Sequence, residues 1–69
     1  MTEFNSTDKK IIKATFDTLQ KEGVTKTTTK KIAAEAGVNE VTIFRKFQNK
    51  KNLVEITKEC YLQRYLDKM

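Results

Sequence analysis

Residues 28–50, TTKKIAAEAGVNEVTIFRKFQNK, contain two short helical patterns separated by a turn. The first pattern begins after Thr28, a residue type that caps helix N-termini. Three apolar residues follow at a spacing that places them on one face of a helix: Ile32, Ala33 and Ala36. Gly37 comes directly after them and predicts the end of this helix, because glycine is the usual residue at a left-handed C-cap.

The second pattern begins after Asn39, another capping residue type, and runs from Glu40 to about Phe47. Ile43 and Phe47 lie four residues apart and are expected to face inward. The outward side then presents a mixed set of residues: Val41, Thr42, Arg45 and Lys46. Two short helices joined by a glycine-containing turn are typical of the helix-turn-helix motif, whose second helix enters the major groove of DNA.

A longer helix is expected before this motif. Residues 1–6 are predicted to form a flexible tail with Ser6 as the N-cap, and the helix itself to span about Thr7 to Lys21. Its buried stripe is predicted to contain five residues at helical spacing: Ile11, Ile12, Thr15, Thr18 and Leu19. Gly23 follows this stripe and is predicted to be a left-handed C-cap glycine.

A fourth helix is expected after Asn49, from Lys50 almost to the end of the chain. One of its stripes contains Leu53, Ile56 and Cys60. A second stripe lies on roughly the opposite side and contains Leu62, Leu66 and Met69, with Tyr61 and Tyr65 between the two. The apolar side chains of this second stripe are either partly exposed, as is common on protein surfaces, or form the docking surface for a further domain.

The sequence therefore predicts an all-α fold without strands. Residues 7–49 are expected to form a three-helix, helix-turn-helix (homeodomain-like) bundle. Residues 50–69 are expected to form the longer fourth helix and to begin the connection to a C-terminal regulatory domain that the chain does not contain.

The positive charge of the chain is concentrated in its middle. Of the net charge of +5, residues 30–51 contribute +4, from six basic and two acidic residues. Residues 1–29 contribute +1, and residues 52–69 contribute zero. A basic zone confined to one part of a small chain is typical of a protein that binds a polyanion such as nucleic acid. The alternative is a solvated basic face without a ligand.

The composition also excludes several classes of protein. There is no histidine and only one cysteine, Cys60, so a His/Cys zinc site and an internal disulfide are both excluded. No phosphate-cradling glycine loop and no nucleophile beside a plausible base is found, so neither an enzymatic activity nor a cofactor is expected. No apolar run reaches the roughly 20 residues of a membrane span, and a cytoplasmic location is expected. Cys60 itself is expected to be a small buried apolar residue.

Four motifs follow one another along the chain: IIxA at residues 11–14, LxxxG at 19–23, TTTxxIAxxAGV at 27–38 and VTIFxxFxNKxxL at 41–53. Together they resemble the N-terminal domain of the tetracycline-repressor (TetR/AcrR) family of bacterial transcriptional regulators. The resemblance covers about Ile11 to Ile56. The three consecutive threonines at residues 27–29 and the FxNKxxL pattern at residues 47–53 also argue against other three-helix DNA-binding modules, such as a recombinase arm.

The resemblance implies DNA contacts at nine positions. Thr29 and Lys30 would touch the phosphate backbone, and Lys50 would add a third such contact, unless the two lysines are only solubilising charges. Five residues would face the major groove: Glu40, Val41, Thr42, Arg45 and Lys46. The Phe44 position is usually a tyrosine whose hydroxyl reaches a phosphate, so here that contact is lost or becomes purely apolar.

The groove-facing residues differ in what they offer to DNA. Arg45 can bond a guanine edge in a bidentate manner, while Val41 and the methyl group of Thr42 can meet a thymine methyl. Glu40 either accepts a hydrogen bond from cytosine N4 or simply favours the positive N-terminal end of its helix. Arg45 and Lys46 are interpreted as contacts to bases or phosphates rather than as solvated surface.

The resemblance further implies partners and a larger protein. Family members bind palindromic operators in double-stranded DNA as homodimers, through a C-terminal helical domain that also binds a small-molecule inducer. The chain is interpreted as a fragment, itself a monomer, of a sequence-specific transcriptional regulator that acts as a repressor. The alternative function is a protein-interaction module that uses the second stripe of the fourth helix, and it predicts no salt-dependent affinity for DNA.

Overall fold

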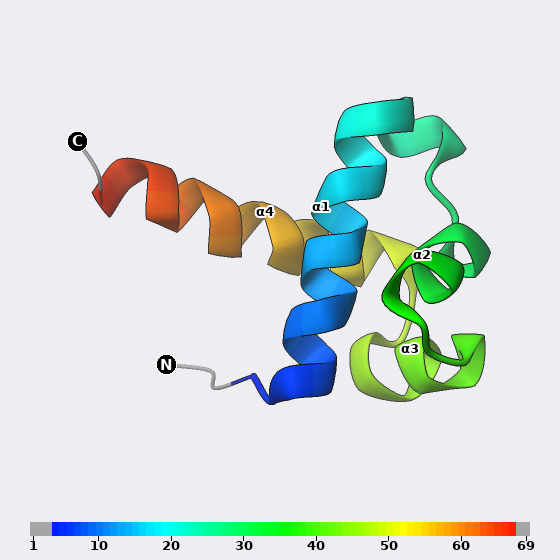
Figure 1. Cartoon of the computed structure of the whole chain (residues 1–69). Coiled ribbons are helices and arrows are strands. Elements are labelled where there is room, and N and C mark those ends of the chain that lie inside the picture. Colours follow the sequence, from blue (N-terminus) through cyan, green and yellow to red (C-terminus); the bar gives the residue numbers. More distant parts are fainter. Residues whose placement is uncertain (1–3, 68–69) are drawn as a thin grey trace.

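The computed structural model describes the backbone of residues 4–67 and the side chains of residues 4–61, and this part of the chain contains helices and no strand. The helices are α1 (Ser6–Lys26), α2 (Thr29–Ala36), α3 (Glu40–Phe47) and α4 (Lys50–Asp67). In Figure 1, α4 crosses α1, while α2 and α3 lie together on one side of both. The expected all-α fold is therefore confirmed. The predicted second stripe of α4 lies outside the residues whose side chains are described, apart from Tyr61 beside it.

The core is small and draws on all four helices. Its buried apolar residues are Ile11, Ile12, Ala14, Ile32, Ala33, Ile43, Phe47 and Leu53. Cys60 is only half-buried and packs against the edge of this cluster, so the prediction that it would be buried was wrong. The inward faces predicted for the three helices of the bundle are otherwise confirmed, with Leu19 and Ala36 half-buried at the margin.

Threonines occupy core positions that an apolar side chain would usually fill. Thr15, Thr18 and Thr57 are at most 6% exposed. Each hydroxyl donates a hydrogen bond of 2.7–2.8 Å to the carbonyl four residues earlier in its own helix. A buried hydroxyl without a partner would be costly, so this local bond is what makes threonine acceptable in the buried stripe.

Asn5, and not Ser6 as predicted, is the N-cap of α1. The Asn5 side-chain oxygen accepts from the backbone amide of Asp8 at 2.9 Å, and the backbone amide of Asn5 donates to Asp8 Oδ2 at 3.2 Å. This reciprocal capping box needs an acceptor side chain three residues after the cap. Ser6 would have Lys9 in that position, which cannot accept a hydrogen bond, and this is the physical reason for the correction.

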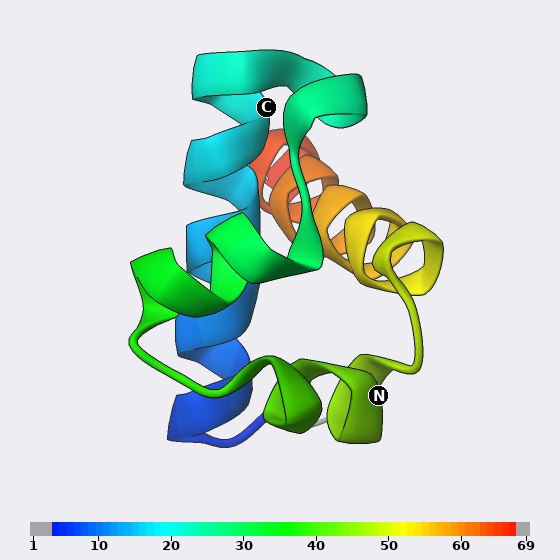
Figure 2. The same ribbon diagram turned by 90° about the vertical axis from the view of Figure 1, so that its right-hand side faces the viewer.

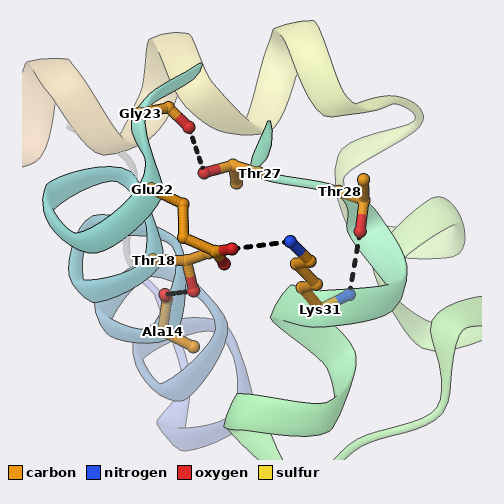
Figure 3. Close-up of polar contacts among 7 residues, drawn as sticks. All are labelled: Ala14, Thr18, Glu22, Gly23, Thr27, Thr28 and Lys31. Carbon is orange, nitrogen blue, oxygen red and sulfur yellow. Dashed lines mark hydrogen bonds and ion pairs between the residues drawn. The ribbon is translucent and has the colours of Figure 1, made fainter. Parts of the chain in front are cut away.

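Gly23 does not end the first helix as a left-handed C-cap. Its φ of 81° is positive as expected, but its ψ of 171° is extended, and a further helical turn continues to Lys26. The Gly23 carbonyl accepts from the Thr27 backbone amide at 3.1 Å and from the Thr27 hydroxyl at 2.7 Å, and Figure 3 shows the bond from the hydroxyl. The predicted end at Lys21 is therefore wrong, because these bonds stabilise a kinked extension of α1 that carries the chain towards α2.

Candidate nucleic-acid interface

The turn between α2 and α3 has well-defined hydrogen bonding. Gly37 ends α2 as predicted, and it adopts the left-handed conformation (φ 72°, ψ 32°). Its amide donates to the Ala34 carbonyl at 3.4 Å, and the Val38 amide donates to the Ala33 carbonyl at 3.0 Å. This pair of bonds is a Schellman motif, in which an apolar residue after the glycine packs back on the helix. Val38 does so against the core, which fixes the direction in which α3 starts.

Each of the last three helices begins at the predicted cap. The Thr28 hydroxyl accepts from the backbone amide three residues later at 3.1 Å, as Figure 3 shows. Asn39 caps α3 by accepting from the amide two residues later at 3.0 Å, and Asn49 caps α4 at 2.8 Å. The helix-turn-helix geometry is therefore set by short-range bonds on both sides of the turn.

The two sides of α3 are clearly separated. Ile43 and Phe47 are 0% and 2% exposed, as their spacing predicted. Val41 and Phe44 are among the few large apolar side chains on the surface, and Arg45 is exposed beside them. The outward side therefore combines apolar surface with one guanidinium, which is the combination that can meet both a thymine methyl and a guanine edge.

The starts of α2 and α3 are joined by a side-chain hydrogen bond. The Thr29 hydroxyl donates to Glu40 Oε2 at 2.8 Å, and both residues are half-buried. A threonine hydroxyl has a single proton to donate, so in this arrangement it has none for a phosphate. The Thr29 backbone amide lies in the first turn of α2, where amides have no partner within the helix, and it is the group of Thr29 that can bind a phosphate.

Lys46 of α3 forms an ion pair with the beginning of α1. Its ammonium lies 3.1 Å from Asp8 Oδ1, and the two side chains are 29% and 16% exposed. Figures 1 and 2 both show α3 next to the N-terminal end of α1. Asp8 Oδ1 is buried, and the Lys46 ammonium compensates its charge.

The other basic residues of the 30–51 zone differ in their partners. Lys31 pairs with Glu22 of α1 at 2.7 Å (Figure 3), and its side chain stays 46% exposed. Lys30 and Arg45 are exposed and form no ion pair in the described part of the chain, while Lys50 is half-buried at the start of α4. The basic zone therefore contains both free cations and cations already held by carboxylates.

A strained residue ends α3. Gln48 has φ 74° and ψ −55°, and the Asn49 amide donates across it to the Phe47 carbonyl at 2.9 Å. This is a classic γ-turn, a rare and strained conformation for a residue with a side chain. The Asn52 side chain donates to the same carbonyl at 2.8 Å and so supports the turn. The strained residue lies between α3 and α4, and nothing in the local sequence predicts it.

The structure thus brings together most of the residues predicted from the sequence. Eight of them lie at the N-terminus of α2 or on α3 (Thr29, Lys30, Glu40, Val41, Thr42, Phe44, Arg45 and Lys46), and Lys50 begins α4. Asp8 was missed. The N-x-x-D pattern of residues 5–8 could have predicted its role in a capping box. That pattern does not predict the contact of Asp8 with Lys46.

Two classes of site are not found in the described residues. No group of carboxylate and thiol side chains within residues 4–61 could hold a metal ion. Among the helices that the structure describes, none combines the length and apolar character needed to cross a membrane.

Comparisons with known proteins agree with this arrangement. The family model described as "Bacterial regulatory proteins, tetR family" matches residues 11–56, which are 46 of the 69 residues. An uncharacterised HTH-type transcriptional regulator of Bacillus subtilis (strain 168), YvkB, is 53% identical over 49 residues. The match covers 71% of this chain and 26% of that protein, so the chain spans about a quarter of its relative's length. No solved structure matches. The chain belongs to the tetR family of bacterial regulatory proteins.

Proposed function

We propose that the chain binds double-stranded DNA in a sequence-specific manner, with α3 lying in the major groove. The observation that carries this proposal is the outward side of α3, where Val41, Phe44 and Arg45 are exposed on a helix whose other side is anchored in the core. A major groove admits one α-helix, and an arginine on that helix reaches guanine O6 and N7. Thr42, half-buried on the same side, offers a methyl group and a hydroxyl to the bases.

Contacts to phosphates would fix the register of α3 in the groove. We assign them to the backbone amide of Thr29 and to the ammonium groups of Lys30 and Lys50, which begin α2 and α4. Phe44 has no hydroxyl for a phosphate and would make apolar contact with sugar or base. Glu40 keeps one carboxylate oxygen beyond its bond with Thr29, and that oxygen is available to a cytosine N4.

We further propose that the chain acts as the DNA-binding part of a longer cytoplasmic repressor. The relative is named an HTH-type transcriptional regulator and is about four times longer than the matched region. A homodimer would place two α3 helices on the two halves of a palindromic operator. A small-molecule inducer would bind to a second domain of that longer protein.

Selection of binding sites from a pool of random duplexes tests the proposal. The chain should enrich a short motif, and affinity should fall steeply with salt because bound phosphates release counterions. The Arg45→Ala variant serves as the matched control and should enrich a weaker or shorter motif. Salt-dependent binding without any enriched motif would mean that the chain binds polyanions without sequence preference. Absence of DNA binding would favour the protein-interaction alternative.

A further inference from the structure

The two ion pairs of the basic zone differ in how firmly they hold their lysines. The Lys31–Glu22 side chains are 46% and 36% exposed, so water and salt screen that pair. The Lys46–Asp8 side chains are 29% and 16% exposed. Asp8 Oδ1 has an exposed area close to zero and accepts no hydrogen bond, so the Lys46 ammonium is its compensating partner in the described part of the chain.

We propose that Asp8 is a specificity-determining positioning residue: its carboxylate holds Lys46 on the protein surface and keeps this lysine from binding DNA phosphates. The inference rests on the proposed function and deepens it, because it removes one of the predicted cationic contacts from α3. Sequence readout then depends on Val41, Thr42 and Arg45, and generic adhesion is reduced by one charge.

The burial of Asp8 supplies the physical reason. If Lys46 turned towards a phosphate, Asp8 Oδ1 would lose its compensating charge, and this loss is more unfavourable for a side chain that is only 16% exposed than for one at the open surface. Asp8 is also held in place from the other side, because its Oδ2 accepts from the Asn5 amide in the capping box. The carboxylate therefore cannot follow the lysine outward without breaking the Asn5 N–Asp8 Oδ2 bond of the capping box.

A paired lysine differs from a free one in a measurable way. A lysine that neutralises a phosphate releases a counterion and steepens the salt dependence of binding, by about 0.9 in the log–log slope per phosphate. A lysine already neutralised by Asp8 contributes nothing to that slope. The salt slope on random-sequence DNA therefore reports whether Lys46 is paired with Asp8 or bound to a DNA phosphate.

The test titrates a labelled random-sequence duplex at several salt concentrations with the 69-residue chain and three variants. Asp8→Asn removes the charge but keeps an oxygen that can accept from the Asn5 amide, so the cap is preserved. Asp17→Asn is the matched control: it raises the net charge from +5 to +6 in the same way, about 14 Å further along α1. The double variant Asp8→Asn/Lys46→Gln restores the wild-type net charge of +5. Circular dichroism checks that each variant is folded.

The Asp8→Asn variant should show a slope steeper by about 0.9, which is about a 3.5-fold larger change in affinity over a fourfold change in salt. Asp17→Asn should show a much smaller change, and the double variant should return to the wild-type slope. Equal slopes for Asp8→Asn and Asp17→Asn would overturn the inference. So would a double variant whose slope is shallower than wild type by about 0.9, because Lys46 would then bind a phosphate in the native chain.

If the wild-type chain bound no duplex at any salt concentration, the proposed function would fail together with the inference. Binding by wild type with either of the two results above would overturn the inference alone.

Discussion

The inner side of α3 carries Ile43 and Phe47, exposed by 0% and 2%, whereas its outer side carries Val41 and Phe44, exposed by 57% and 45%. The two phenylalanines are three residues apart and chemically identical, yet one fills the core and the other faces solvent. Burying an aromatic side chain contributes a large share of the stability of a small domain. Leaving one on the surface contributes little stability and makes sense as contact surface for a partner.

This contrast separates the residues that anchor α3 in the core from the residues that α3 exposes to solvent. The inner side and the Schellman turn at Gly37 determine where the helix lies and how it is rotated. Val41, Phe44 and Arg45 are exposed on the outer side, so these residues can be changed without disturbing the core. The predictions below test this separation from the largest expected effect to the smallest.

Truncation of Phe47 should have the largest effect. Phe47→Ala should lower the free energy of unfolding by about 3 to 5 kcal/mol, which is enough to unfold much of a domain this small. Phe44→Ala removes the same atoms from the outer side and should change stability by less than about 0.5 kcal/mol. Thermal melts followed by circular dichroism measure both. Similar losses for the two variants would mean that the assigned rotation of α3 is wrong.

Removal of the Arg45 guanidinium should affect DNA binding and leave folding intact. Arg45→Ala should lose about 1 to 3 kcal/mol of binding free energy on a selected site and relax the preference at one base position. Its melting temperature should match wild type, because the side chain is exposed. Affinities for single-base variants of the site provide the measurement. A uniform loss across all sequences would make Arg45 a phosphate contact and leave readout to Val41 and Thr42.

The turn should respond to substitution at Gly37 by a smaller amount. An added Cβ would meet no atom within 4 Å, so only the positive φ opposes a side chain. Gly37→Ala should destabilise by about 1 to 2 kcal/mol, and Gly37→Asn by less, because asparagine tolerates the left-handed conformation. Urea unfolding of the two variants checks the order. Equal stability of the alanine variant and wild type would contradict the strain argument.

The sequence predicted those features of the fold that depend on neighbouring residues. Thr28, Asn39 and Asn49 cap helices through bonds to amides two or three residues away, so each could be recognised from its own short segment. The N-terminal cap was misplaced because Asn5 and Ser6 are both capping residue types, and only the identity of the residue three positions later decides between them. Gly23 was assigned the right sign of φ and the wrong conformation, since its carbonyl binds a threonine beyond the predicted helix.

The sequence did not predict the long-range polar contacts at the candidate interface. Asp8 and Lys46 are 38 positions apart, and the bond between Thr29 and Glu40 depends on the angle at which α2 meets α3. Such pairs follow from the packing of helices against one another, which residue patterns within a single helix do not contain. That these residues would lie on α3 and at the starts of α2 and α4 was therefore predictable, but which of them are already engaged within the protein was not.

The smallest expected effect concerns Lys30, an exposed lysine in the first turn of α2 that we assign to a phosphate contact. Lys30→Ala should weaken binding to all sequences alike and lower the salt slope by about 0.9. Lys13→Ala, an exposed lysine in the middle of α1, serves as the control and should change the slope less. A change in base preference for Lys30→Ala would place this lysine in the groove instead of on the backbone.

The central claim, that the outer side of α3 reads the major groove, is tested most directly by changing the DNA one atom at a time. Replacing guanine by 7-deazaguanine removes only the N7 acceptor in the major groove, and replacing it by inosine removes only the minor-groove amino group. At the guanine contacted by Arg45, the 7-deaza substitution should cost wild type about 1 to 3 kcal/mol of binding free energy, and should cost the Arg45→Ala variant almost nothing. Inosine should be tolerated by both. Insensitivity of wild type to 7-deazaguanine throughout the selected site, together with weakened binding on inosine, would contradict the account.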